Sequence, residues 1–533
     1  MLFIPPAQPM PDHGPRCGVV DLGSNSVRLV VYEGYTRNPI SIFNEKAVLR
    51  LGRGLQTTGR LNEEGMAQAL TVMHRYHAVA LAMGAKPFEV LATAAVRDAE
   101  NGAAFVEQLR DRLSGVPIHI LSGIEEAAYS ADGMLCGIPA ADGVLADIGG
   151  GSLEVVRLVN GTRGPSQTLK LGVIRLAERS GGDPVRARAI AEADLQTVPW
   201  LGQAAGSDLY LVGGAWRALA RIHMAQTDYP LQMVHHYTIG REEARDLTGL
   251  ISTAARKVLE RLPGAPRRRI DDLPLAAVAL RRLLRVTGVR RVVFSASGLR
   301  EGWFMRRMPR AIREQDPLLS AAWEMAGRYG RDPSLPPALV EWTEPLFPRE
   351  SPAAARLREA ACWMSDIGSH DHPEFRAEQS FLRVLRQPGV GLDHHARAFL
   401  ALASALRYEA ESDAPFLRPS RLLLDIETAN RAEVLGIALR LAYTLSAGTK
   451  DLLAGTRLRI EGERLVLRLR ENSGVFAGES VIRRLERLAQ SLGLQAAAEP
   501  DLAEAAECSG LPSRMKQGKC ARLLSRPIRD MWR

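Results

Sequence analysis

Two short segments place a carboxylate before a turn of small residues, each at the end of an apolar stretch. The first is Asp21-Leu22-Gly23-Ser24-Asn25-Ser26, and the second is Asp147-Ile148-Gly149-Gly150-Gly151-Ser152. A turn of this kind exposes backbone N–H groups in a concave nest, and such nests bind phosphate oxygens. An aspartate at the end of the preceding strand can hold a divalent cation or its water shell. The two segments therefore predict phosphate and metal chemistry.

The candidate ligands follow from these turns. Glu154 lies seven positions after Asp147, so both carboxylates can reach one metal ion, and Asp21 is a further candidate for that site. Either turn alone is more often a structural loop than a binding site. Two related turns plus a third glycine pair are far more specific for a phosphate-binding site. The residues of the three turns predicted to bind phosphate are Ser24, Asn25, Ser26, Gly149, Gly150, Gly151, Ser152, Gly213 and Gly214.

The turns must be positioned by flanking strands. A strand, an acid, a turn and a returning strand occur twice, over residues 17–33 and 143–156. Further strands are predicted at 88–92, 117–121, 209–212 and 291–295, and helices at 64–83, 103–113 and 125–135. Alternating strands and helices predict α/β layers, and the repeated unit predicts two lobes with a cleft between them.

The composition and the hydrophobic pattern change after about residue 308. Residues 310–450 are rich in Ala, Leu and Arg with helical spacing, residues 457–469 have the alternation of a hairpin, and a helix is predicted over about 480–492. The expected organisation is a loose tail (1–15), a first lobe (16–140), a second lobe (141–308), a helical domain (309–450), a small α+β segment (451–505) and a disordered basic tail (506–533).

Composition indicates an ordinary globular protein. The 533 residues are 46% hydrophobic and 24% charged, and 69 Lys and Arg against 60 Asp and Glu give a net charge of +9. Five scattered cysteines without a CxxC pair argue against a disulfide framework or a cysteine-rich zinc site. Because the sequence shows neither a signal peptide nor an apolar run of membrane-spanning length, we expect a cytoplasmic protein without a membrane partner.

These blocks, in this order, resemble the exopolyphosphatase/guanosine pentaphosphate phosphohydrolase (Ppx/GppA) family, of the exopolyphosphatase type. The remaining matching blocks are Ala92-Thr93-Ala94-Ala95-Val96-Arg97-Asp98, Ser122-Gly123-Ile124-Glu125-Glu126-Ala127 and Gly298-Leu299-Arg300-Glu301-Gly302. The resemblance implies two actin-like, ribonuclease H-like lobes of the actin, sugar-kinase and heat-shock-ATPase (ASKHA) superfold. The helical domain is similar, more loosely, to an HD-phosphohydrolase fold.

The family's residue roles carry over onto the matching positions. Glu126 takes the place of the catalytic glutamate that activates water, Arg97 that of a phosphate-binding arginine, and Asp147 and Glu154 those of the magnesium-coordinating positions. Arg300, with Arg217, is expected to extend a cationic track for a trailing polymer. The implied reaction is the Mg²⁺-dependent release of orthophosphate from the end of inorganic polyphosphate, by direct attack of water. Other divalent cations, and a monovalent cation such as K⁺, are also compatible, and a homodimer is expected.

The helical domain carries a partial metal-ligand pattern. Residues 369–372, 393–395 and Asp425 supply histidines and aspartates of the HD type, but no ligand set follows from their spacing. A degenerate scaffold that borders the polymer groove is the preferred interpretation.

Other functions stay open at this level. A guanosine pentaphosphate 5′-phosphohydrolase would use the same catalytic parts. A non-catalytic sensor of polyphosphate or guanosine tetraphosphate would keep the cleft without turnover, and a sugar-type kinase would need an acceptor and an Asp base that is not evident. Nucleic acid is not an expected partner, because the basic stretches lack interleaved aromatic residues.

Overall fold

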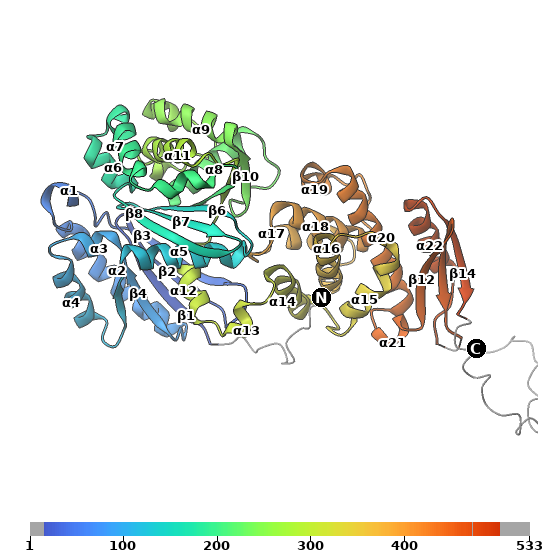
Figure 1. Ribbon diagram of the computed structural model, residues 1–533. Helices are drawn as coiled ribbons and strands as arrows, with labels where there is room; N and C mark the ends of the chain where they lie inside the picture. Colours follow the sequence, from blue (N-terminus) through green and yellow to red (C-terminus); the bar gives the residue numbers. More distant parts are fainter. Residues whose placement is uncertain (1–14, 472, 502–533) are drawn as a thin grey trace, which may run out of the picture.

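The computed structural model describes residues 15–471 and 473–501, so the predicted tail 506–533 and all but the last residue of the predicted tail 1–15 lie outside these ranges. The chain begins with a five-stranded sheet of order β3-β2-β1-β4-β5 (Figure 1). Strands β1, β2 and β3 are antiparallel neighbours, whereas β4 and β5 extend the sheet in parallel from β1. Its strands are β1 (Cys17–Leu22), β2 (Ser26–Tyr32), β3 (Ser41–Val48), β4 (Phe88–Ala92) and β5 (Ile118–Ile120).

A second sheet repeats this topology. Its order is β10-β11-β9-β6-β7-β8, with β6, β7 and β8 antiparallel and with β9 and β11 extending in parallel from β6. The predicted duplication is therefore confirmed at the level of strand connectivity. The strands are β6 (Gly143–Ile148), β7 (Leu153–Val159), β8 (Thr162–Leu169), β9 (Asp208–Val212), β10 (Tyr237–Gly240) and β11 (Arg291–Phe294).

Helices pack on both sheets. We call the first sheet and its helices the first lobe, and the second sheet and its helices the second lobe. The first lobe contains α1 (Leu55–Thr58), α2 (Glu63–Ala82), α3 (Ala94–Asp98) and α4 (Gly102–Arg112). The second contains α6 (Val173–Ser180), α7 (Pro184–Gln196), α8 (Gly214–Gln226), α9 (Arg241–Thr253), α10 (Arg256–Leu259) and α11 (Leu273–Thr287).

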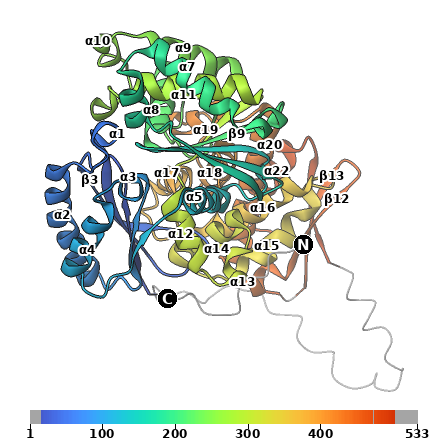
Figure 2. The same ribbon diagram turned by 60° about the vertical axis from the view of Figure 1, so that its left-hand side comes forward.

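Two helices, α5 (Gly123–Gly137) and α12 (Leu299–Arg307), lie side by side between the sheets (Figure 2). Their backbones touch at glycines. A Cβ on Gly133 would lie 1.8 Å from the carbonyl oxygen of Gly298, and one on Gly302 would lie 1.8 Å from that of Tyr129. Since any side chain would push the helices apart, these two glycines permit the close crossing.

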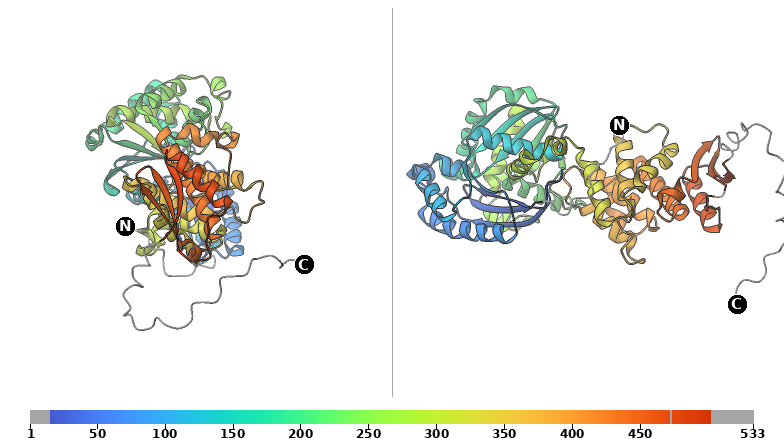
Figure 3. Two further views of the ribbon diagram at one scale, coloured as in Figure 1. Left: turned by 90° about the vertical axis from the view of Figure 1, so that its right-hand side faces the viewer. Right: turned by 90° about the horizontal axis from the view of Figure 1, so that it is seen from below.

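Beyond α12 the chain is mainly helical and ends in a third sheet, which makes the molecule elongated (Figure 3). The helices are α13 (Arg310–Arg313), α14 (Pro317–Tyr329), α15 (Leu335–Thr343), α16 (Pro352–Trp363), α17 (Arg376–Arg386), α18 (His394–Arg407), α19 (Arg418–Leu423), α20 (Ile426–Ser446), α21 (Lys450–Leu453) and α22 (Glu479–Ser491). The sheet, of order β12-β13-β14, contains β12 (Thr456–Glu461), β13 (Arg464–Leu469) and β14 (Gln495–Pro500). No helix in the described residues is both long and apolar enough to span a membrane.

Several elements carry too little pattern to be predicted. The edge strand β3 is exposed or half-buried along its whole length, so its sequence shows no apolar face. Helix α11 also goes unpredicted: its first half is almost wholly apolar and buried, and charged side chains appear only from Arg281 onward. The predicted hairpin and the helix after it are present as β12, β13 and α22.

Candidate active site

A cavity of about 160 Å³ lies between the two lobes and is lined from both sides. It contains every predicted phosphate-binding residue of the three glycine turns, together with Asp21, Glu126, Asp147 and Arg300. Two of the predicted site residues, Arg97 and Glu154, are not part of its lining. Both lie directly behind residues that are.

The first turn is held from behind by the loop after β3. The carbonyl oxygen of Asn25 accepts hydrogen bonds from the backbone N–H groups of Leu49 and Arg50 (3.1 and 3.0 Å), and that of Ser24 accepts one from Gly52 (2.8 Å). The carbonyl groups of the turn therefore bond to the loop. This arrangement leaves the side chains of Ser24, Asn25 and Ser26 on the cavity wall.

The second turn faces the first at van der Waals distance. A Cβ on Gly150 would lie 3.0 Å from the Cβ of Ser24, and one on Gly151 would lie 3.0 Å from the Ser24 Oγ. The N–H groups of Ile174 and Arg175 donate to the carbonyl of Gly150 (2.9 and 3.1 Å), so the start of α6 supports this turn. The run of glycines is thus needed for the two turns to approach one another.

Two carboxylates stand together at the end of β6. Asp147 and Glu154 are direct cross-strand partners in the β6–β7 register. Burial raises the pKa of both groups. The nearby carboxylates of Glu126 and Asp147 raise the pKa of Glu154 further. The Oε1 atom of Glu154 is buried without a hydrogen-bond partner among the described residues. An orphaned oxygen beside a second buried carboxylate is the environment that a divalent cation would satisfy.

Asp21 has a different environment. Its Oδ2 accepts a hydrogen bond of 3.4 Å from the Nη1 of Arg300. This bond joins the first lobe to the start of α12. Across the described residues, no three Asp, Glu, His or Cys side chains gather closely enough to hold a metal ion by themselves. Mg²⁺ commonly takes only one or two carboxylates and completes its shell with water and substrate phosphates, so the Asp147–Glu154 pair fits this metal.

Glu126 enters the cavity from the first turn of α5. A capping box of Ser122 and Glu125 starts the helix, which assigns Glu125 to the helix end and leaves Glu126 free for the cavity. Glu126 is 9% exposed, and its Oε2 lies 3.1 Å from the Nη1 of Arg97. Burial raises the pKa of Glu126 to about 7. Of the neighbouring charges, Arg97 lowers this pKa and Asp147 raises it. A carboxyl that titrates near neutral pH is suited to proton transfer.

Arg97 lies beside Glu126 and does not line the cavity. Besides Glu126, its guanidinium contacts Asp98 (3.0 Å) and the carbonyl of Leu121 (3.0 Å). In this arrangement Arg97 holds the carboxylate of Glu126. Its contact with phosphate stays a prediction, since these bonds use only its Nε and Nη1 atoms.

Sequence reasoning missed several cations of the cavity wall. The missed Arg28 and Lys46 are direct cross-strand partners on β2 and β3. The missed Arg269 faces them from the second lobe, together with the predicted Arg217. Burial first, and then the neighbouring arginines, lower the pKa of Lys46 to about 8. Burial likewise lowers the pKa of Arg217 to about 10. Like charges placed directly opposite each other repel, so this wall is built to receive an anion.

The same cations also line a second cavity of about 810 Å³. Eight arginine or lysine residues line it, and none of its described lining residues is aromatic. Of its two acidic residues, Asp272 pairs with Arg269 (2.9 Å) and Asp271 pairs with Arg256. The cationic residues are Arg28, Lys46, Arg50, Arg53, Arg217, Arg221, Arg268 and Arg269.

The HD-type residues do not come together. Asp393 and Asp425 cap the N-termini of α18 and α20, and Asp371 pairs with Arg383 at 2.9 Å. His394 contacts the hydroxyl of Tyr229 (2.8 Å) and the carbonyl of His235 (3.0 Å). These contacts favour the interpretation of this region as a scaffold.

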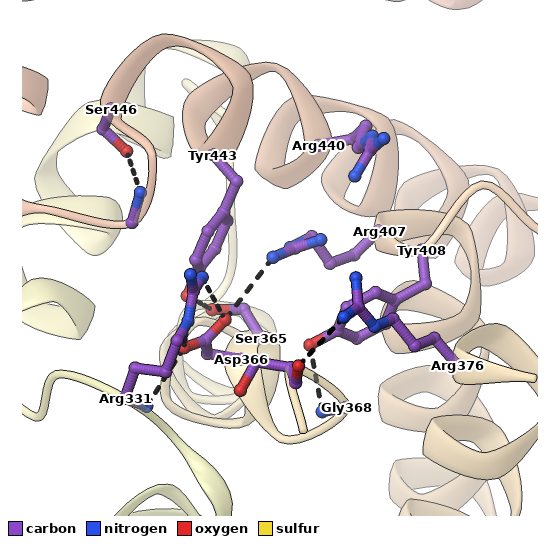
Figure 4. A network of polar contacts seen from close by, with 12 residues as sticks. Arg331, Ser365, Asp366, Gly368, Arg376, Arg407, Tyr408, Arg440, Tyr443 and Ser446 are labelled. Atoms are coloured by element: carbon purple, nitrogen blue, oxygen red, sulfur yellow. Dashed lines mark hydrogen bonds and ion pairs between the residues drawn. The ribbon is translucent and has the colours of Figure 1, made fainter. Parts of the chain in front are cut away.

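The interior of the helical region instead contains an ion-pair network (Figure 4). Asp366 bonds to Arg331 at 2.9 Å and lies 3.5 Å from Arg407. The guanidinium of Arg407 lies 3.7 Å from the ring centre of Tyr443 and 4.3 Å from that of Tyr408. A buried cation between rings and opposite a carboxylate stabilises packing without a ligand.

Comparison with known proteins agrees with the fold. The sequence profile of the Ppx/GppA phosphatase family matches residues 30–311, and the profile of the exopolyphosphatase C-terminal family matches residues 318–498. Exopolyphosphatase 1 of Mycobacterium tuberculosis is 28% identical over 305 residues, which cover 55% of this chain and 88% of that protein. Retrograde regulation protein 2 of Saccharomyces cerevisiae is 24% identical over 438 residues, covering 74% of this chain and 72% of that protein.

A solved structure matches the two lobes. The crystal structure of an exopolyphosphatase from Cytophaga hutchinsonii superposes with a TM-score of 0.50 at 21% identity, over 54% of this chain and 96% of that chain. This likeness shows the fold of the two lobes.

The chain belongs to the Ppx/GppA phosphatase family. It is a hydrolase of the phosphatase type. The predicted family membership and enzyme class are therefore confirmed.

Proposed function

We propose that this enzyme is an exopolyphosphatase, which hydrolyses the terminal phosphoanhydride bond of inorganic polyphosphate with Mg²⁺ as cofactor. The observation that carries this proposal is the adjacency of two cavities. A small cavity that contains the candidate base Glu126 shares six lining residues with a larger cavity lined by cations. The small one suits a single terminal phosphate, and the large one suits a chain of phosphates with about one negative charge each.

The terminal phosphate would bind between the two glycine turns. The turns present backbone and side-chain donors from both lobes, and Arg300 adds a guanidinium at the same cavity. Asp147 and Glu154 would hold Mg²⁺, which when bound neutralises charge on the phosphate oxygens. Donors that are already in place cost no reorganisation when charge develops in the transition state.

Glu126 would be the general base. It accepts a proton from a water molecule, whose oxygen attacks the terminal phosphorus while the bond from phosphorus to the bridging oxygen breaks. The products are orthophosphate and a chain one phosphate shorter, which takes its electron pair on the released bridging oxygen. Arg97 holds the carboxylate of Glu126 in position from behind.

The large cavity favours polyphosphate over guanosine pentaphosphate. A guanine base is commonly bound by stacking on an aromatic ring, and no described residue of this cavity supplies one. Its dominant property is positive charge without matching carboxylates, which fits an inorganic polyanion.

The test is orthophosphate release by the purified protein with Mg²⁺, from long-chain polyphosphate, guanosine pentaphosphate and ATP, beside the Glu126→Gln variant. We expect polyphosphate to be hydrolysed with the highest kcat/KM. The variant should lose at least about a hundredfold in kcat while it still binds polyphosphate.

Each other outcome has a definite meaning. Higher kcat/KM on guanosine pentaphosphate would keep the mechanism and overturn the proposed substrate. Tight binding of polyphosphate without any turnover, equal in wild type and variant, would indicate a sensor and refute the catalytic role.

A further inference from the structure

Helix α5 carries two buried polar side chains on one face. Glu126 lies in its first turn, and Ser130 lies one turn further along. Residues four apart on a helix are neighbours on the same face, so both point toward the end of β6. Ser130 is fully buried, and its Oγ donates a hydrogen bond to the Oδ2 of Asp147.

This contact is the hydrogen bond that orients Asp147. Within the described residues, no other hydrogen bond or ion pair involves the Asp147 carboxylate. The bond holds Oδ2 toward α5, while Asp147 itself lines the cavity. The direction of this carboxylate therefore depends on one hydroxyl group.

Solvent cannot replace that hydroxyl. Ser130 has no exposed surface, and α12 closes the site from the other side. A Cβ on Gly298 would lie 3.5 Å from the Ser130 Oγ and 3.8 Å from the Asp147 Oδ2. Removing the hydroxyl would leave a buried carboxylate oxygen unsatisfied, which is costly for a charged group.

We propose that Ser130 is a positioning residue, which orients Asp147 for Mg²⁺ and links the metal site to the helix that carries the base. The proposal rests on the proposed function, since it takes Asp147 as a metal ligand. Residues that orient a metal ligand in this way typically change metal affinity by about 10- to 100-fold when they are substituted.

The experiment compares wild type, Ser130→Ala and Ser180→Ala in the full-length protein. Ser180 is a matched control, because it is also fully buried on a helix and donates only within that helix, to Leu176 and Ala177. Metal affinity is measured directly by titration with Mn²⁺ followed by electron paramagnetic resonance, and kinetically as the Mg²⁺ concentration for half-maximal activity. Thermal unfolding without metal reports folding.

We expect Ser130→Ala to weaken Mn²⁺ binding by about 10- to 100-fold and to raise the Mg²⁺ midpoint by a similar factor. At saturating Mg²⁺, kcat should return to within a few-fold of wild type. Ser180→Ala should shift neither midpoint. A Ser130→Cys variant keeps a weak donor and should fall between wild type and Ser130→Ala, which preserves the test if the alanine variant does not fold.

An unchanged metal midpoint in Ser130→Ala, or an equal shift in Ser180→Ala, would overturn the positioning role while leaving the proposed function intact. A wild-type protein that hydrolyses polyphosphate without binding Mn²⁺ or Mg²⁺ would overturn both the metal site and this inference.

Discussion

The two lobes share one topology but place opposite charges at the same point. In the first lobe, Asp21 at the end of β1 has Arg28 as its cross-strand partner. In the second lobe, Asp147 at the end of β6 has Glu154 in the equivalent place. The first pair joins opposite charges and adjoins more cations, whereas the second consists of two carboxyl groups. This difference fits the proposal that the second lobe holds the metal, while cations of both lobes line the path of the polyanion.

The largest expected effect comes from removing charge in the second lobe. Glu154→Gln should lower kcat by about a thousandfold, equivalent to about 4 kcal/mol, because the metal loses a ligand. Orthophosphate release at saturating Mg²⁺ measures it. Glu324→Gln is the matched control, since Glu324 is also a buried carboxyl but bonds to Asn38 outside the site. A Glu154→Gln enzyme with normal kcat and Mg²⁺ dependence would contradict the proposal that the second lobe holds the metal.

A smaller effect is expected from removing charge in the first lobe. Arg28→Met should raise KM for long-chain polyphosphate by about tenfold, as expected for losing one charge-assisted contact, and should leave kcat within a few-fold. Initial rates at several ionic strengths measure it, since a lost cation also weakens the dependence of KM on salt. A fall in kcat without a change in KM would place Arg28 in the catalytic step instead.

The pH dependence of the base sharpens the comparison further. Because the pKa of Glu126 is about 7 and the base must be ionised, kcat should fall about tenfold per pH unit below that value. Arg97 lowers this pKa, so Arg97→Met should move the acidic limb to higher pH by about one unit. The profile of kcat from pH 5 to 9 measures both. An acidic limb that stays in place would show that Arg97 does not act on Glu126.

The smallest effect is expected on the alkaline side, from the first lobe. The pKa of Lys46 is about 8, so its charge is lost as the pH rises through that value, and KM for polyphosphate should increase by about two- to threefold. Lys46→Arg should abolish this rise, because arginine stays protonated. KM measured between pH 7 and 9.5 tests it. A rise that persists in the variant would assign the titration to another group.

Local sequence signals predicted the strands and turns that carry the chemistry. Both acid–glycine turns, the Gly213-Gly214 turn and the helix of Glu126 lie at the predicted positions, because short apolar runs, glycines and caps are local properties. The cationic wall could not be predicted in the same way. Lys46 lies on β3, which has no apolar face, and its pairing with Arg28 on β2 arises only when β3 adds to the sheet edge.

Long-range contacts also placed two further sets of residues. Arg97 lies in the matching motif, and the fold brings its guanidinium against Glu126, which lines the cavity, while Arg97 itself does not. The histidines and aspartates of the helical region stand close in sequence, but their helices turn them toward caps, ion pairs and the second lobe.

The sequence by itself therefore determined the family, the duplicated order of strands and the types of residue that can bind phosphate and metal. Only the tertiary structure decided which of them share a site. Asp147 acquires its orientation from Ser130 on another element, and Gly150 acquires its importance from Ser24 in the other lobe. The physical reason is that turn and strand formation depend on neighbours along the chain, whereas the direction and pKa of a buried side chain depend on groups brought to it by packing.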